Sequence, residues 1–183
     1  VLKRLSDENT IYATDLFFSQ VSSANTDNRA LEIYNGTGKD ICLEDYRVVT
    51  DIHTGSGSYS STVVLGFTER DTIKSDSCIV IMQALHAMEN NVNGVFYVNP
   101  SVIGTVVIDG NDPIALIKGN DTIDIFGNFG ESISNQQGWN DEGTRTAKTV
   151  LQRRPWVTKG VKTNVQSGFS TLASQWQQLG NLS

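Results

Sequence analysis

The sequence predicts an all-β protein with an immunoglobulin-like antiparallel β-sandwich of about nine or ten short strands. Short apolar runs recur at roughly 8–15-residue spacing, with no alternating helical segments between them. The segments between the runs are rich in Gly, Asn, Ser and Thr, and the chain has 16 Gly but only 3 Pro. This composition favours many strands joined by turns.

The chain of 183 residues is long enough for one domain with its own core. We expect residues 1–14 to form an N-terminal tail or linker, because they show no sustained period, and residues 15–183 to form the sandwich. The chain lacks an initiator Met and a signal-like start, so we expect a processed product. No apolar run approaches the ~20 residues of a membrane-spanning helix.

The first strands surround a Gly-rich corner. Asp15–Val21 reads as a strand, and Ala30–Tyr34 alternates apolar and polar residues. Asn35-Gly36 is a strong tight-turn signal, so Ile41–Val49 is predicted to return as the partner strand. The corner lacks the spacing of a phosphate-binding loop, and no helix follows it.

The later elements follow the same logic. Ser77–Met82 is a continuous apolar run, which is typical of a strand buried on both faces. Gln83–Asn93 favours a short helix or an irregular loop, and Phe169–Leu179 favours a turn of helix or a last strand. The other predicted strands are Thr62–Phe67, Val95–Val98, Val102–Ile108, Ile114–Lys118, Thr122–Phe126 and Thr149–Arg154.

No residues assemble into a catalytic motif. His53 and His86 lie in loop-like segments without a nucleophile signature nearby. We therefore predict a protein that is not an enzyme and needs no cofactor.

Asp109, Asn111 and Asp112 resemble half of a Ca²⁺-binding loop, but no Glu closes a twelve-residue loop. Turn formation explains these residues better, and Ca²⁺ binding remains the alternative.

Cys42 and Cys78 are the only cysteines. Both lie in strand-like runs, which leaves two roles open: a disulfide across the sheet, or thiols that fill core space.

Charge divides the chain. The net charge is −6, yet all 20 acidic residues precede Gly143, so the last 41 residues carry only positive charge. One interpretation is a polyanion-binding patch, and the favoured one is a basic strand inside an acidic sandwich. The six basic residues are Arg145, Lys148, Arg153, Arg154, Lys159 and Lys162.

Trp139, Trp156 and Trp176 suit either sugar stacking or packing, and packing is the commoner role.

Five segments in order resemble the lamin tail domain, in its bacterial secreted form, over Asp15–Leu179. Glu32, Tyr34, Asn35 and Gly36 match an E-I-Y-N-G core. The other matches are Leu43 with Tyr46, the Asp76–Met82 strand, Gly110–Gly130 (Asp112, Ala115, Leu116, Asp124 and Gly127), Thr149–Gly160 and Ser174–Trp176. Gln83–Ser101, the Gln136–Lys148 loop and the two cysteines depart from the family pattern.

The resemblance implies an immunoglobulin-like sandwich in which a late-strand arginine, Arg153 or Arg154, has a structural role. It also implies a non-catalytic binding or adhesion module that is secreted or at the cell surface, with a protein or a surface polymer as partner. The alternatives are a structural subunit of a surface or viral assembly, and a nucleic-acid-tethering module of a secreted nuclease system.

Overall fold

A computed structural model describes residues 11–24, 29–53, 59–83, 94–98, 108–131, 133 and 138–181. The mostly-β class is confirmed: these residues form ten strands of four residues or longer, four strands of two residues, and one helix of four residues, α1 (Leu172–Gln175). No helix in this part of the chain is long and apolar enough to cross a membrane. The predicted Val102–Ile108 strand and the Gln83–Asn93 helix or loop fall largely outside the described residues.

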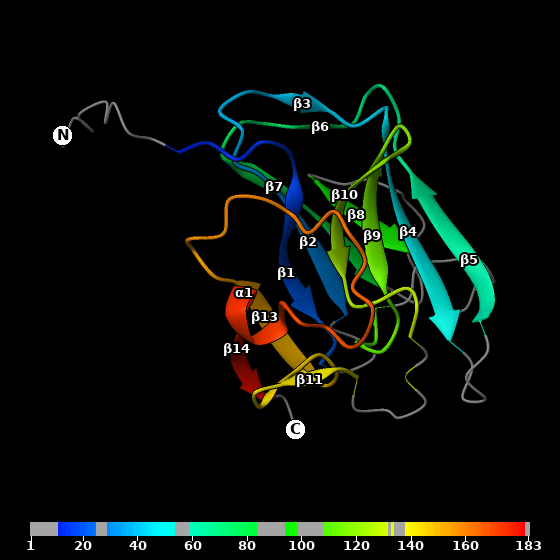
Figure 1. Ribbon diagram of the computed structural model, residues 1–183. Helices are drawn as coiled ribbons and strands as arrows, with labels where there is room; N and C mark the ends of the chain where they lie inside the picture. Colours follow the sequence, from blue (N-terminus) through cyan, green and yellow to red (C-terminus); the bar gives the residue numbers. More distant parts are fainter. Residues whose placement is uncertain are drawn as a thin grey trace.

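Two larger sheets carry the fold (Figure 1). The six-stranded sheet has the order β14-β13-β1-β2-β7-β8, and the four-stranded sheet has the order β10-β9-β4-β5. All pairs in these sheets are antiparallel except β7 with β8, which is parallel. The strands of the six-stranded sheet are β1 (Phe17–Ser22), β2 (Ala30–Asn35), β7 (Ser77–Gln83), β8 (Val95–Val98), β13 (Thr149–Arg153) and β14 (Trp176–Asn181). Those of the four-stranded sheet are β4 (Tyr46–His53), β5 (Tyr59–Gly66), β9 (Ile114–Lys118) and β10 (Asp121–Phe126).

Both large sheets contribute to a single hydrophobic core. Leu31, Ile33 and Leu151 come from the six-stranded sheet, and Val48 and Leu116 from the four-stranded sheet; each is fully buried. Burial alternates along β2 and β13, as expected for strands with one face on the core. β7 also alternates, so the prediction that this strand is buried on both faces is wrong.

The corner after β2 is not a hairpin. β2 pairs with β1 and β7, and its chain continues into β3 (Ile41–Cys42), which pairs with β6 (Thr72–Ile73) in a separate two-stranded ribbon. The predicted pairing of Ala30–Tyr34 with Ile41–Val49 is therefore wrong. Within the corner, Gly38 takes the positive φ, at 80°, and Gly36 does not.

Asn35 organises this corner from within. Its side chain is fully buried, and its Nδ2 donates to the carbonyl oxygens of Lys39 and Ile73 at 2.7 and 2.9 Å. Its Oδ1 accepts hydrogen bonds from the amide and the hydroxyl of Thr37. The end of the expected N-terminal tail also packs here, since Ala13 is buried and its amide donates to the Gly36 carbonyl. The described end of the expected tail therefore contacts the fold.

Candidate binding surface

The carboxylate of Asp124 in β10 accepts hydrogen bonds from several segments that lie far apart in the sequence. Arg153 at the end of β13 donates through Nη2 to both of its oxygens, at 2.9 and 3.2 Å. The amides of Phe18 and Val161 also donate to it, at 2.9 and 2.7 Å. Asp124 therefore joins β1, β10, β13 and the loop after β13, and we call this set of residues the Asp124 cluster.

Burial dominates the electrostatics of this cluster. The side chains of Arg153 and Asp124 are 2% and 0% exposed. Burial raises the pKa of the Asp124 carboxyl, and the Arg153 guanidinium with three backbone amides opposes that rise. The guanidinium carbon of Arg153 also lies 4.6 Å from the centre of the Trp176 ring. Nε and Nη1 of Arg153 have no hydrogen-bond partner, but both atoms are buried within the fold. The cluster is therefore enclosed, and its role is to support the fold.

Gly160 brings the loop after β13 onto β10. A Cβ at this glycine would lie 2.4 Å from the carbonyl oxygen of Ile123 and 2.5 Å from Cβ of Asp124. Only glycine permits this approach, which places the Val161 amide on the carboxylate. Asp124, Arg153 and Gly160 all belong to the segments that resemble the lamin tail pattern, and in this structure they serve one structural contact.

A second polar network surrounds Thr146 and Trp139. The Thr146 hydroxyl donates to the Gly110 carbonyl and accepts from the amide of Trp139. Trp139 donates through Nε1 to Glu131 at 2.9 Å and is 3% exposed. Trp139 is therefore a packing residue, and so is Trp176, which is fully buried.

The predicted polyanion patch is divided. Arg153 is buried against Asp124, so its assignment as a surface contact is wrong. Arg145 and Lys148 are exposed before β13, whereas Arg154, Lys159 and Lys162 follow it. The five residues of β13 separate Lys148 from Arg154 by roughly 16 Å, beyond the ~8 Å screening length at physiological salt. Arg145 lies in β12 (Thr144–Arg145), which packs near α1, and the Ala173 carbonyl of α1 accepts from Arg154. Lys148 is thus set apart from the cations that follow β13.

The group after β13 contains the exposed tryptophan. Trp156 is 67% exposed, and the Arg154 guanidinium carbon lies 5.4 Å from the centre of its ring. Two hydrogen bonds fix the Arg154 side chain: its Nε and Nη2 donate to the Ala173 carbonyl at 3.3 and 3.1 Å. Pro155 occupies the second position of a turn in which the Val157 amide donates to the Arg154 carbonyl.

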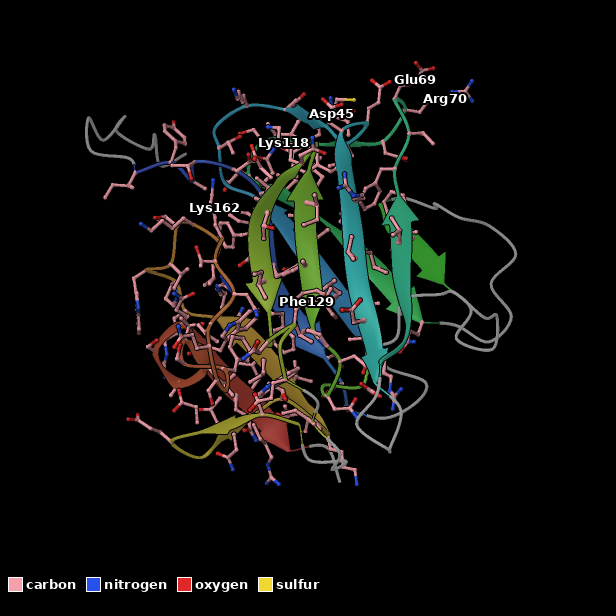
Figure 2. All side chains as sticks on the ribbon, turned by 45° about the vertical axis from the view of Figure 1, so that its right-hand side comes forward. Asp45, Glu69, Arg70, Lys118, Phe129 and Lys162 are labelled. Carbon is pink, nitrogen blue, oxygen red and sulfur yellow. The ribbon has the colours of Figure 1, made fainter. Side chains whose placement is uncertain are left out.

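Further anchors hold the loop that carries this tryptophan. The Val161 amide bonds to Asp124, and Asn164 donates through Nδ2 to Asn128 at 2.9 Å. Lys159 and Lys162 are exposed, one on each side of Val161 in the chain, and Figure 2 shows Lys162 on this loop at the side of the molecule. We call Arg154, Trp156, Lys159 and Lys162 the Trp156 surface. No local sequence signal separates Trp156 from the two buried tryptophans, Trp139 and Trp176.

Asp109, Asn111 and Asp112 form a turn. The Asn111 amide donates to Oδ1 of Asp109 at 3.2 Å, and Asp112 is 2% exposed. Among the described residues, no group of three or more His, Cys, Asp or Glu side chains is placed to hold a metal ion. The turn interpretation accounts for the geometry observed.

Cys42 and Cys78 are free thiols, both exposed. They lie on different sheets, Cys42 in β3 and Cys78 in β7. Their sulfur atoms contact other groups, namely the Glu69 carbonyl at 3.6 Å and the Glu32 carboxylate at 3.3 Å. The structure therefore contains neither the disulfide nor the core-filling thiols that the sequence left open.

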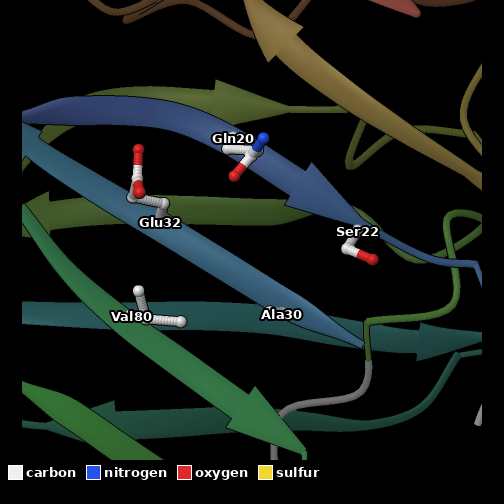
Figure 3. Close-up of a pocket in the computed structure, with 5 residues that line it drawn as sticks. All are labelled: Gln20, Ser22, Ala30, Glu32 and Val80. Atoms are coloured by element: carbon white, nitrogen blue, oxygen red, sulfur yellow. The ribbon is translucent and has the colours of Figure 1, made fainter. Parts of the chain in front are cut away.

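The outer face of the six-stranded sheet carries a shallow hollow of ≈ 40 Å³ (Figure 3). Its lining residues are Gln20, Ser22, Ala30, Glu32 and Val80. Pockets for small molecules usually measure about 300–1,000 Å³. The Glu32 carboxylate already accepts from the Ser19 hydroxyl at 2.6 Å. This hollow has room for water molecules and not for a substrate.

No known family model matches the chain, and no curated protein is significantly similar to it.

Proposed function

We propose that this protein is a non-catalytic binding module of an extracellular or cell-surface protein, and that the Trp156 surface contacts the partner. The proposal includes an immunoglobulin-like sandwich of the lamin tail type. The resemblance of the five sequence segments supports it, as does the packing of two largely antiparallel sheets on one core. The parallel β7–β8 pair is a departure from the purely antiparallel form.

One observation carries the binding role: Trp156 is 67% exposed on a loop that hydrogen bonds hold to the buried side chains of Asp124 and Asn128. A tryptophan offers a large rigid contact area with little conformational entropy to lose. Tryptophan and arginine are also the residues most enriched at the energetic centres of interfaces. Because Arg154 stacks on Trp156 and bonds to the chain beneath it, the surface is ordered before a partner arrives.

The chemistry of the surface indicates the partner. It presents one flat aromatic ring, two exposed lysines and the half-buried Arg154, and no acidic residue follows Glu142 in the sequence. Such a surface fits a negatively charged partner with flat apolar faces, as in an acidic polysaccharide or an acidic protein segment.

Fluorescence of Trp156 tests the proposal, because the other two tryptophans are buried. The protein is titrated with alginate and with poly-glutamate, and both emission and bound fraction are followed. We expect a saturable change with at least one of them, and Trp156→Ala should weaken binding by about tenfold or more.

Lys148→Ala is the matched control, since Lys148 is an exposed cation at the far end of β13. It should change affinity by less than about twofold, in line with a small rim charge. Equal losses in the two variants, or binding that survives Trp156→Ala, would refute the proposed surface.

Nucleic-acid tethering is the alternative that the basic residues raise. With Arg153 buried and Lys148 at the far end of β13, few phosphates contact the protein at once. For a single-stranded oligonucleotide bound at the Trp156 surface, a plot of log K against log salt concentration should have a slope of about −2, because each of the three cations contributes about −0.7. A much steeper slope, together with loss in both Trp156→Ala and Lys148→Ala, would favour the tethering module over the proposal.

A further inference from the structure

The four edges of the two large sheets differ in how they are protected. β10 is covered, because the Phe18 amide of β1 bonds to Asp124 and Gly160 lies against Ile123. β14 carries an irregularity opposite Val150 and Leu151. β8 has only four residues. Coverage, bulges and short length are the usual devices that prevent strand pairing at an edge.

β5 has almost none of these devices. It is eight residues long and pairs with β4 alone among the described strands. Figure 2 shows it at the border of the four-stranded sheet, beside β4. Its sequence, YSSTVVLG, contains no charged residue and no proline. One irregularity occurs between the Ser61 and Tyr59 pairings, so the pairing from Ser61 to Gly66 is regular.

An apolar row crosses the four-stranded sheet and ends at this edge. The cross-strand partners Ile125, Ala115, Val49 and Val64 follow one another from β10 to β5. Each is the neighbour in sequence of a residue that packs in the core or against it, namely Phe126, Leu116, Val48 and Leu65. The row therefore lies on the face opposite the core.

Exposure rises along this row. Ile125 is 5% exposed and Ala115 is 4% exposed, Val49 is half-buried, and Val64 is 55% exposed. The row is thus covered at β10 and open at β5. An open apolar row that meets an uncharged edge strand offers both backbone groups and side chains for a further strand.

We infer that β5 is an interface for a second copy of this chain, in which the two β5 strands pair antiparallel about a twofold axis. Two identical strands without charge pair with no like-charge contact, even though each chain carries a net charge of −6. Twofold pairing extends both four-stranded sheets into one, and it continues the apolar row of each copy into the other. Such an interface is self-complementary, as in most homodimers.

The contact is small. A standard interface buries about 1,600 Å², more than one strand pair supplies, so we expect a reversible dimer whose population depends on concentration. This inference uses residues on the opposite sheet edge from the Asp124 cluster and does not rest on the proposed partner of Trp156.

Sedimentation velocity of the full chain, over about three decades of concentration, tests the inference. We expect monomer at the lowest concentrations and dimer at the highest. Val64→Lys should weaken the dimer by about tenfold or more, because it places a positive charge on the paired edge of each copy. Leu179→Lys is the matched control: Leu179 is 51% exposed on the edge strand β14, and its replacement should change the dimer affinity by less than about twofold.

Gly66→Lys provides a second variant in case Val64→Lys impairs folding. A Cβ at Gly66 meets nothing within 4 Å, so the monomer accommodates the side chain. The inference is supported if Gly66→Lys has the far-UV spectrum of the wild type and weakens the dimer as much as Val64→Lys does. A chain that stays monomeric at all concentrations overturns it, and so does a dimer that resists both lysine variants or responds equally to Leu179→Lys.

Discussion

Two adjacent arginines have opposite environments. Arg153 ends β13 with its side chain buried in the Asp124 cluster, whereas Arg154 begins the following turn and supports the exposed Trp156. The alternation of a strand accounts for the difference, since neighbouring residues point to opposite faces. The cost of burying a guanidinium is offset only because a carboxylate and an aromatic ring receive it. A charged residue in a sequence therefore indicates an exposed surface only where no buried residue of opposite charge pairs with it.

The largest expected effect comes from removing Arg153, and Arg154 provides the comparison. Arg153→Met leaves the Asp124 carboxylate buried without its counter-ion and should lower the free energy of unfolding by about 3–5 kcal/mol. Arg154→Met removes hydrogen bonds to one carbonyl and should cost about 0.5–1.5 kcal/mol. Urea denaturation measures both.

The double variant Asp124→Leu with Arg153→Met sharpens this result. It should be more stable than Arg153→Met alone, because no unpaired charge remains buried. Similar losses for the two arginine variants would mean that the buried pair does not distinguish the two positions.

The approach of the loop to β10 gives the next effect. Gly160→Ala places a methyl group 2.4 Å from the Ile123 carbonyl oxygen, so the loop must shift. We expect a loss of about 1–3 kcal/mol, the usual cost of overpacking. Gly180→Ala is the control, since nothing lies within 4 Å of the added Cβ. It should be neutral or stabilising by up to about 1 kcal/mol, because alanine restricts the unfolded chain. If thermal unfolding ranked the two variants in the reverse order, the close contact at Gly160 would be disproved.

The smallest expected effect concerns the reactivity of Cys78 and not the stability of the fold. Although the residue as a whole is exposed, partial burial of its sulfur atom and the Glu32 carboxylate raise the pKa of the Cys78 thiol to about 11. At pH 8 the thiolate fraction is then about 0.1%, against roughly a quarter for an ordinary thiol. In a Cys42→Ser variant, iodoacetamide should label Cys78 far more slowly in the folded chain than in urea, as measured by mass spectrometry.

The sign of the linkage follows from the raised pKa. The folded state retains the thiol proton more strongly, so this stabilising contribution is complete below the ordinary thiol pKa and is lost as pH rises through about 11. Glu32→Gln should speed the labelling of Cys78 in the folded chain. An unchanged labelling rate in Glu32→Gln would mean that Glu32 does not raise the pKa of Cys78. Fast labelling of Cys78 in the folded Cys42→Ser variant would contradict the raised pKa itself.

Much of the strand content was predictable because the apolar alternation is local. Ala30–Tyr34, Ile114–Lys118 and Thr122–Phe126 all lie within strands, and the closing segment supplies both the helical turn and the last strand that Phe169–Leu179 suggested. Strand partners were less predictable. Asn35-Gly36 is a hairpin signal on local grounds, but β2 pairs with β1 and β7, because the core decides which strands meet.

The candidate site was less accessible to sequence reasoning. Trp139, Trp156 and Trp176 all stand among polar residues, and only the packing of distant segments shows which one reaches the surface. The buried role of Arg153 depended likewise on Asp124, 29 residues away in the chain. A run of positive charge does not reveal such a partner, whereas the family resemblance had suggested a structural arginine at this place.

The buried Asn35 has a consequence for producing the protein in a eukaryotic secretory pathway. Asn35-Gly36-Thr37 fits the acceptor pattern for N-linked glycosylation. In the folded chain the amide nitrogen of Asn35 is fully buried and bonded to the carbonyls of Lys39 and Ile73, so the modifying enzyme has no access to it. A glycan added to the nascent chain would replace a hydrogen atom of this amide, and the corner leaves no space for a sugar. Glycosylation and correct folding at Asn35 are therefore mutually exclusive, and Asn35→Asp would not rescue the yield, because a carboxylate cannot donate to the two carbonyls.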